Sequence, residues 1–254
     1  MYMNEFDGVD RRVWGPWATA GLGLVVGGVF ILVQIVVGVF FVAVKVTSDS
    51  KQDALKLAQD LGTNGLFIAL ATFATAVVCV GLVLLFVKLR RGASAAEYLA
   101  MGPISLKMLL ALLGISSGFI LLSDGLTLVL GRSTIPQFMV DIYRTSLYPS
   151  LLGIALTLAG PAFEEIFFRG FLLEGFRQSR IGNTGAVVLT ALIWTAIHLQ
   201  YGLYELATIF ALGLLLAIAR VKTGSIWSCF VMHAFFNLVS LAETAMYVGP
   251  LYDG

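Results

Sequence analysis

The chain has 254 residues, of which 59% are hydrophobic and 12% are charged, and its formal net charge is +1. About a quarter of the residues in a soluble domain are charged, so this composition excludes an ordinary soluble globular protein. The near-neutral charge gives no reason to expect a nucleic-acid partner. The mean hydropathy of +0.93 comes from runs of about 20 apolar residues, which is the length of a membrane-spanning helix.

We therefore predict an integral membrane protein with an all-α fold, a polytopic transmembrane helical bundle that contacts membrane lipid. Seven apolar segments predict seven spans, and an eighth is left open. In chain order they lie at about 17–44, 65–87, 105–130, 149–173, 184–200, 204–220 and 226–248. Pro161 is expected to kink the fourth span, because proline removes a helix hydrogen bond. Residues 131–148 are too polar to span, which predicts a lid or an interfacial helix.

Lysine and arginine residues in the loops predict the orientation, because they accumulate on the inner side of a membrane. With the N-terminus inside, the inner segments hold Arg11, Arg12, Lys88, Arg90, Arg91, Lys107, Arg177, Arg180, Arg220 and Lys222. The outer segments hold Lys45, Lys51, Lys56, Arg132 and Arg144. This imbalance predicts an inner N-terminus and, with seven spans, an outer C-terminus. The depth of the polar residues in their spans suggests a cavity that opens to the inner face.

The fourth predicted span contains three ionisable residues, Glu164, Glu165 and Arg169. Each ionisable group in hydrocarbon costs about 2.5–3.5 kcal/mol on insertion scales, so its presence needs a functional explanation. Glu165 and Arg169 are four residues apart and share a helix face, which predicts that they pair. Glu164 points about 100° away around the helix and is left free for chemistry.

The two histidines of the chain, His198 and His233, both lie in apolar segments. His233 and Asn237 are four residues apart and therefore share one helix face. A single histidine in such a segment is often a packing residue. Two histidines, two glutamates and an asparagine in neighbouring apolar segments favour a common polar site instead.

These residues form three motifs that resemble those of the CPBP family of intramembrane proteases, which includes the type II CAAX prenyl endopeptidases and the bacterial Abi proteins. Glu164-Glu165-Ile-Phe-Phe-Arg169 resembles the family motif Glu-Glu-x-x-x-Arg. Trp194-Thr-Ala-Ile-His198 resembles Phe-x-x-x-His, with tryptophan in place of phenylalanine, and His233-Ala-Phe-Phe-Asn237 resembles His-x-x-x-Asn. The motifs occur in the family's order.

The resemblance covers about residues 148–248 and predicts a catalytic core of about four spans there. Residues 1–147 would form an N-terminal region with about three spans and the polar lid-like segment. Residues 249–254 would form a short tail.

The resemblance implies an endopeptidase that hydrolyses a peptide bond of a membrane-associated substrate, either a CAAX-like prenylated peptide or a leader-type peptide. Glu164 would activate water and His198 would help to hold it. Glu165 and Arg169 would orient Glu164. His233 and Asn237 would stabilise the oxyanion. The alternative is a non-catalytic membrane scaffold or bacteriocin-immunity protein of the same family.

The cofactor is left open between none and zinc. Glu164, His198 and His233 would be a catalytic zinc set, with water as the fourth ligand. The common His-Glu-x-x-His signature is absent from the sequence, and the three ligands would come from three separate helices. Both a metal-free glutamate mechanism and a metalloprotease are therefore carried forward.

Three further acidic residues lie in or beside apolar segments. Asp124 precedes Gly125, which predicts a helix break. Glu205 is expected to be a helix-start acid. Glu243 is expected to reach the outer surface, with a place in the site as the less favoured alternative.

Overall fold

The computed structural model describes residues 13–48, 53–92 and 94–249, and these residues form helices and loops without a strand. Six helices in these ranges are long and apolar enough to cross a membrane. They are α1 (Pro16–Ser48), α3 (Gly65–Leu89), α5 (Leu106–Val129), the composite helix Pro149–Phe176, α11 (Leu203–Thr223) and α12 (Ile226–Val248). The predicted all-α polytopic bundle is confirmed.

The predicted span at 184–200 corresponds to a shorter helix, α10 (Gly182–Ala196), which has 15 residues. At 1.5 Å per residue it is about 22 Å long, which is less than the roughly 30 Å of a bilayer core. The chain continues as a loop through residues 197–202 to the start of α11.

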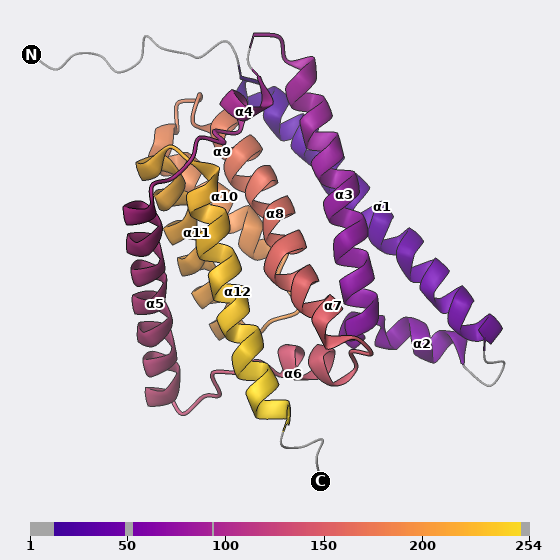
Figure 1. Ribbon diagram of the computed structural model, residues 1–254. Coiled ribbons are helices and arrows are strands. Elements are labelled where there is room, and N and C mark those ends of the chain that lie inside the picture. Colours follow the sequence, from indigo (N-terminus) through magenta and orange to yellow (C-terminus); the bar gives the residue numbers. More distant parts are fainter. Residues whose placement is uncertain (1–12, 49–52, 93, 250–254) are drawn as a thin grey trace, which may run out of the picture.

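The start of α1 and the end of α12 lie at opposite ends of the bundle (Figure 1). Hydrogen bonds define the first end: Trp14 Nε1 donates to Phe86 O over 2.9 Å, and Ile226 N donates to Ala100 O over 2.9 Å. The short helix α4 (Ala95–Tyr98) lies at this end as well. Because α1 starts at one end of the bundle and α12 finishes at the other, the arrangement agrees with an odd number of membrane crossings. Which end faces the inside stays a prediction.

The composite helix contains two π-helical segments. It consists of α7 (Pro149–Ile154), the π-helical η2 (Ala155–Ala159), α8 (Gly160–Glu164), the π-helical η3 (Glu165–Leu172) and α9 (Leu173–Phe176). The first π-helical segment ends at Ala159, two residues before Pro161, which has no backbone N–H to bond to the preceding turn. The second begins at Glu165, inside the first predicted motif. π-Helical turns are frequent at functional sites.

Helix α5 runs without interruption through Asp124 and Gly125, so the predicted break there is wrong. One glycine inside a helix costs only about 1 kcal/mol relative to alanine. A break between apolar residues would leave backbone groups without partners in the membrane, which costs more.

The polar segment 131–148 contains α6 (Gln137–Arg144), which lies across the end of the bundle where α12 ends (Figure 1). Its buried residues Met139 and Ile142 pack with Leu152 and Ala155 of the composite helix. The same end carries α2 (Ala54–Asp60) and the 3-10 turn η1 (Leu61–Thr63). The predicted lid or interfacial helix is therefore a short helix packed against the bundle.

The main hydrophobic core joins both halves of the chain. It includes Val26 of α1 and Cys79 of α3 together with Phe171, Trp194 and Leu216. The two parts of the chain share this core, so the packing does not separate a region 1–147 from a core 148–248. That division stays a prediction.

Candidate active site

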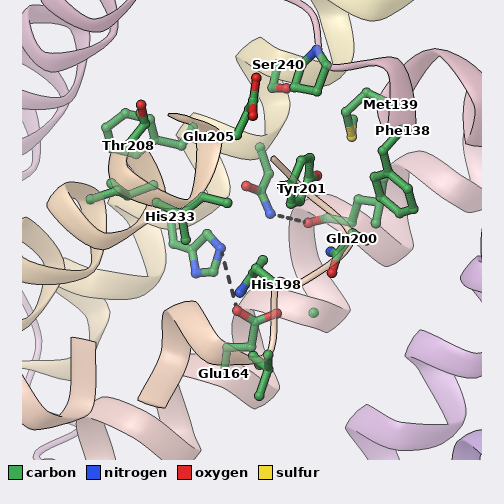
Figure 2. A pocket seen from close by; sticks show the side chains of 18 of the residues that line it. Phe138, Met139, Glu164, His198, Gln200, Tyr201, Glu205, Thr208, His233 and Ser240 are labelled. Carbon is green, nitrogen blue, oxygen red and sulfur yellow. Dashed lines mark hydrogen bonds and ion pairs between the residues drawn. The ribbon is translucent and has the colours of Figure 1, made fainter. Parts of the chain in front are cut away.

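A cavity of about 630 Å³ lies inside the bundle, within the range of ligand pockets. Four of the six predicted site residues line it: Glu164, His198, His233 and Asn237. Figure 2 shows Glu164, His198 and His233 grouped on one side of this cavity, with Glu205 and Ser240 on the other side. The bundle thus brings residues from three separate apolar helical segments to one cavity.

Glu165 and Arg169 lie behind the cavity wall, where they are 1% and 0% exposed. Arg169 Nη1 lies 3.0 Å from Glu165 Oε1, which is the pairing that their spacing predicts. Arg169 Nη2 also donates to Gly213 O over 3.3 Å. A Cβ atom on Gly213 would come within 2.9 Å of the Trp194 ring, so this close approach needs a glycine.

Glu165 also binds His233 of α12, which the sequence analysis did not predict. His233 Nδ1 lies 2.7 Å from Glu165 Oε1. A carboxylate has no proton to donate, so we assign the hydrogen to Nδ1. The Nε2 atom then faces the cavity, 4.0 Å from Glu164 Oε2. Glu165 therefore orients His233 directly, and Arg169 compensates its charge.

Glu164 is 18% exposed and has one direct hydrogen-bond donor, Trp194, whose Nε1 lies 2.5 Å from Glu164 Oε2. The family pattern has phenylalanine at this position, and phenylalanine has no such donor. The signal for the hydrogen bond was the departure from this pattern, because a buried indole N–H needs an acceptor.

His198 follows the end of α10, and its Nδ1 lies 2.8 Å from Trp194 O. A carbonyl only accepts, so Nδ1 carries the proton and Nε2 is an acceptor. The ring packs edge-on against Trp194 at 4.8 Å and stacks with Tyr201 at 6.4 Å between centroids. Burial raises the pKa of the Tyr201 hydroxyl, and the charge of Glu164 raises it further, so this hydroxyl stays protonated.

Asn237 is fixed by the π-helical segment η2. Its Nδ2 donates to Leu156 O over 2.8 Å. The amide group has a second N–H and a carbonyl oxygen, which are left for a ligand in the cavity.

The zinc set that the sequence left as one of two possibilities does not come together. Across the described ranges 13–48, 53–92 and 94–249, no three histidine, cysteine, aspartate or glutamate side chains lie close enough to hold one metal ion. Glu164, His198 and His233 line one cavity without forming such a group. The residues as arranged do not fit a metal, and we base no step of the reaction on one.

The cavity extends from Glu164 toward the end of the bundle where α12 ends. Its lining there includes Ser133, Phe138, Gln200 and Glu205, which belong to α6, the loops beside it and the start of α11. This end is opposite to the start of α1. An inner N-terminus and a cavity that opens inward therefore exclude each other. The side of the membrane that each end faces, and with it the direction in which the cavity opens, stays a prediction.

The further acidic residues lie around the same cavity. Asp124, Glu205 and Glu243 all belong to its lining. Glu205 lies in the first turn of α11, as predicted. Glu243 takes the less favoured of its two expected places, since it belongs to the cavity lining.

Comparison with known proteins gives matches in the same part of the chain. Residues 146–239 match the model of the family described as type II CAAX prenyl endopeptidase Rce1-like. The chain is also 32% identical over 101 residues to an uncharacterized 24.3 kDa protein of Escherichia coli. That match covers 38% of this chain and 46% of the other protein, so it spans less than half of either. No solved structure matches the chain significantly.

The three predicted motifs, from Glu164 to Asn237, lie entirely within the matched residues. The same residues surround the cavity or support its wall. Residues 146–239 of this chain are therefore similar to the Rce1-like type II CAAX prenyl endopeptidases over the stretch that holds all three motifs.

Proposed function

We propose that this protein is an intramembrane endopeptidase that hydrolyses a peptide bond of a membrane-associated substrate, with Glu164 as the general base. One observation carries the proposal. Glu164 lines a cavity of about 630 Å³ with one hydrogen-bond donor, Trp194, and with His233 Nε2 at 4.0 Å. The neighbouring Glu165 is buried in an ion pair with Arg169, so Glu164 is the carboxylate of the motif that faces the cavity.

Glu164 takes a proton from water while the water oxygen attacks the substrate carbonyl carbon. The Nε2 atom of His198 accepts the second hydrogen of this water and holds it in place, because Nδ1 is committed to Trp194 O. The C–N bond then breaks, and the proton on Glu164 passes to the leaving amine. A positioned acid–base group of this kind accelerates a reaction by about 10²–10⁴-fold.

The carbonyl oxygen gains negative charge during the attack and needs donors. Asn237 supplies the N–H that is not bonded to Leu156 O. His233 in its protonated form donates from Nε2, while Nδ1 stays on Glu165. One oriented donor in a dry site contributes roughly 3–4 kcal/mol to transition-state stabilisation.

Glu165 and Arg169 are positioning residues in this proposal. Neither side chain lines the cavity. Glu165 fixes the ring of His233 by a hydrogen bond, and Arg169 lies 4.6 Å from the Trp194 ring centre. Both residues that flank Glu164 are therefore held by one buried ion pair.

The proposed substrate is either a CAAX-like prenylated peptide or a leader-type peptide. The cavity supports both, since its lining combines aromatic and aliphatic side chains with a few polar groups. Pockets with that mixture bind ligands that are mostly apolar and orient them through a small number of polar contacts.

The test uses the full-length chain in liposomes with two probes, a farnesylated peptide ending in a CAAX motif and an acylated leader-type peptide, each carrying a quenched fluorophore. We expect cleavage of at least one probe, and loss of that cleavage in Glu164→Gln. The matched control is Asp60→Asn, which removes an exposed carboxylate outside the cavity. Folded protein that cleaves neither probe, or Glu164→Gln protein that cleaves as fast as the unchanged chain, would instead support the non-catalytic scaffold.

A further inference from the structure

The charge of the cavity lining is one-sided. Four carboxylates line it, Asp124, Glu164, Glu205 and Glu243, together with the two histidines. Among the described lining residues there is no lysine and no arginine. A cavity lined by one sign of charge, with low-dielectric walls, concentrates ligands of the opposite sign.

The carboxylates outside the motif lack a direct partner among the described side chains. Within the described part of the chain, Asp124, Glu205 and Glu243 form no hydrogen bond and no ion pair. Arg132 and Arg169 contact residues of the lining but do not belong to it themselves. Arg132 lies over the ring of Tyr204 at 4.9 Å, and Arg169 is paired with Glu165 behind the wall.

These carboxylates lie between the proposed catalytic residues and the open end of the cavity. Glu243 is on α12, six residues after Asn237, which places it about 9 Å further along the helix axis. Glu205 is in the first turn of α11, and Figure 2 shows it on the side of the cavity opposite Glu164. An extended peptide advances about 3.3 Å per residue. A substrate side chain about three residues from the bond that faces Glu164 therefore reaches Asp124, Glu205 and Glu243. We call these three carboxylates the acidic wall.

We propose that the cavity selects a substrate with a lysine or arginine about three residues from the cleaved bond and rejects one with a free carboxylate at that place. This inference rests on the proposed function and narrows it. A CAAX motif ends in the free C-terminal carboxylate, which the acidic wall would repel. The charge of the cavity thus favours an internal bond of a basic, leader-type peptide that is anchored in the membrane.

The test separates binding from cleavage. The probes are acylated peptides that are identical and uncharged except at one position, which carries lysine, glutamine or glutamate and is moved stepwise along the sequence. A fourth probe ends in a free carboxylate at that position, while the others end in an amide. Binding is measured by fluorescence anisotropy with the Glu164→Gln chain in uncharged phosphatidylcholine liposomes, and cleavage is measured with the unchanged chain.

We expect the lysine peptide to bind about tenfold more tightly than the glutamine peptide, and the glutamate and carboxylate-ended peptides to bind more weakly than both. The preference should shrink when salt is raised to about 0.5 M, because salt screens charge pairs. Asp124→Asn and Glu243→Gln should each reduce the lysine-to-glutamine ratio about threefold. Asp60→Asn, an exposed carboxylate at the same end of the molecule, should keep the ratio.

Equal binding of the lysine, glutamine and glutamate peptides would overturn the charge selection, as would tighter binding of the carboxylate-ended peptide. Cleavage that depends on Glu164 but shows no charge preference would overturn this inference and leave the proposed peptidase standing. A clear lysine preference in binding without any cleavage would overturn the peptidase and leave the charge selection standing.

Discussion

Glu164 and Glu165 are neighbours in the chain and have the same side chain, but they lie in opposite surroundings. Glu165 is 1% exposed and is bound by Arg169 and His233. Glu164 is 18% exposed, lines the cavity and is held by one indole N–H. A buried carboxylate that is bound by a cation and an imidazole can support a structure but has little freedom to move protons. The environment of each carboxylate, and not its type, therefore determines its role.

The largest effect is expected from Glu164→Gln. The substitution keeps the shape and removes the base, so kcat/KM for the cleaved probe should fall by about 10³–10⁴-fold. Thermal unfolding should change little, because the side chain is part of the cavity lining. Parallel rates and melting curves check this. A drop in melting temperature as large as that of Glu165→Gln would remove the distinction between the two residues.

Arg169→Met is expected to act on stability first. It leaves Glu165 buried without its cation, and breaking a buried pair costs about 3–5 kcal/mol. The double variant Glu165→Leu with Arg169→Met removes both charges and should recover most of the stability but none of the activity, because His233 loses its anchor. Chemical unfolding in detergent with a matched activity assay measures both quantities. Recovery of activity in the double variant would contradict the positioning role.

Trp194→Phe tests the carboxylate that lines the cavity, Glu164. It restores the residue of the family pattern, removes the N–H that donates to Glu164 Oε2 and replaces the buried indole by a smaller ring. One hydrogen bond to a charged group contributes about 1.5–3 kcal/mol, so kcat should fall about tenfold or somewhat more. His233 and Glu165 stay in place, and the stability should fall by less than in Arg169→Met. An unchanged kcat would show that the indole fills space only.

A smaller effect is expected at high pH, far from the cavity. Burial raises the pKa of Tyr98 from 10.0 to about 12, since the ionised form is poorly solvated there. The group is neutral in both states below pH 10, so its contribution to stability is fully present there. It is lost as the pH rises from about 10 through about 12. Tyr98→Phe should flatten the fall of melting temperature in this window, and an unchanged slope would contradict the assignment.

The smallest expected effect is that of metal removal. The described histidine, cysteine, aspartate and glutamate side chains form no group of three with ligand geometry. We therefore expect cleavage by detergent-solubilised protein to survive exhaustive chelation. Added zinc after chelation serves as the control. Loss of cleavage that zinc restores would support the ligand set Glu164, His198 and His233 instead.

The sequence predicted best those features that depend only on residues close together in the chain. The long apolar runs predicted six spans to within four residues at each end, because a helix in a membrane must satisfy its own backbone groups. The pair of Glu165 and Arg169 followed from a spacing of four residues. The length of α10 and the unbroken path of α5 through Asp124 were predicted less well, because neighbouring helices decide where an apolar segment stops being helical.

The sequence by itself determined that this chain is a helical membrane protein with scarce polar residues in three motifs, since composition and helix periodicity are properties of single segments. Only the tertiary structure decided that His233 turns its Nδ1 to Glu165, that Trp194 donates to Glu164, and at which end of the bundle the cavity lies. Glu165 and His233 are 68 residues apart. Contacts over such separations depend on how helices pack and rotate against one another, which no local spacing encodes.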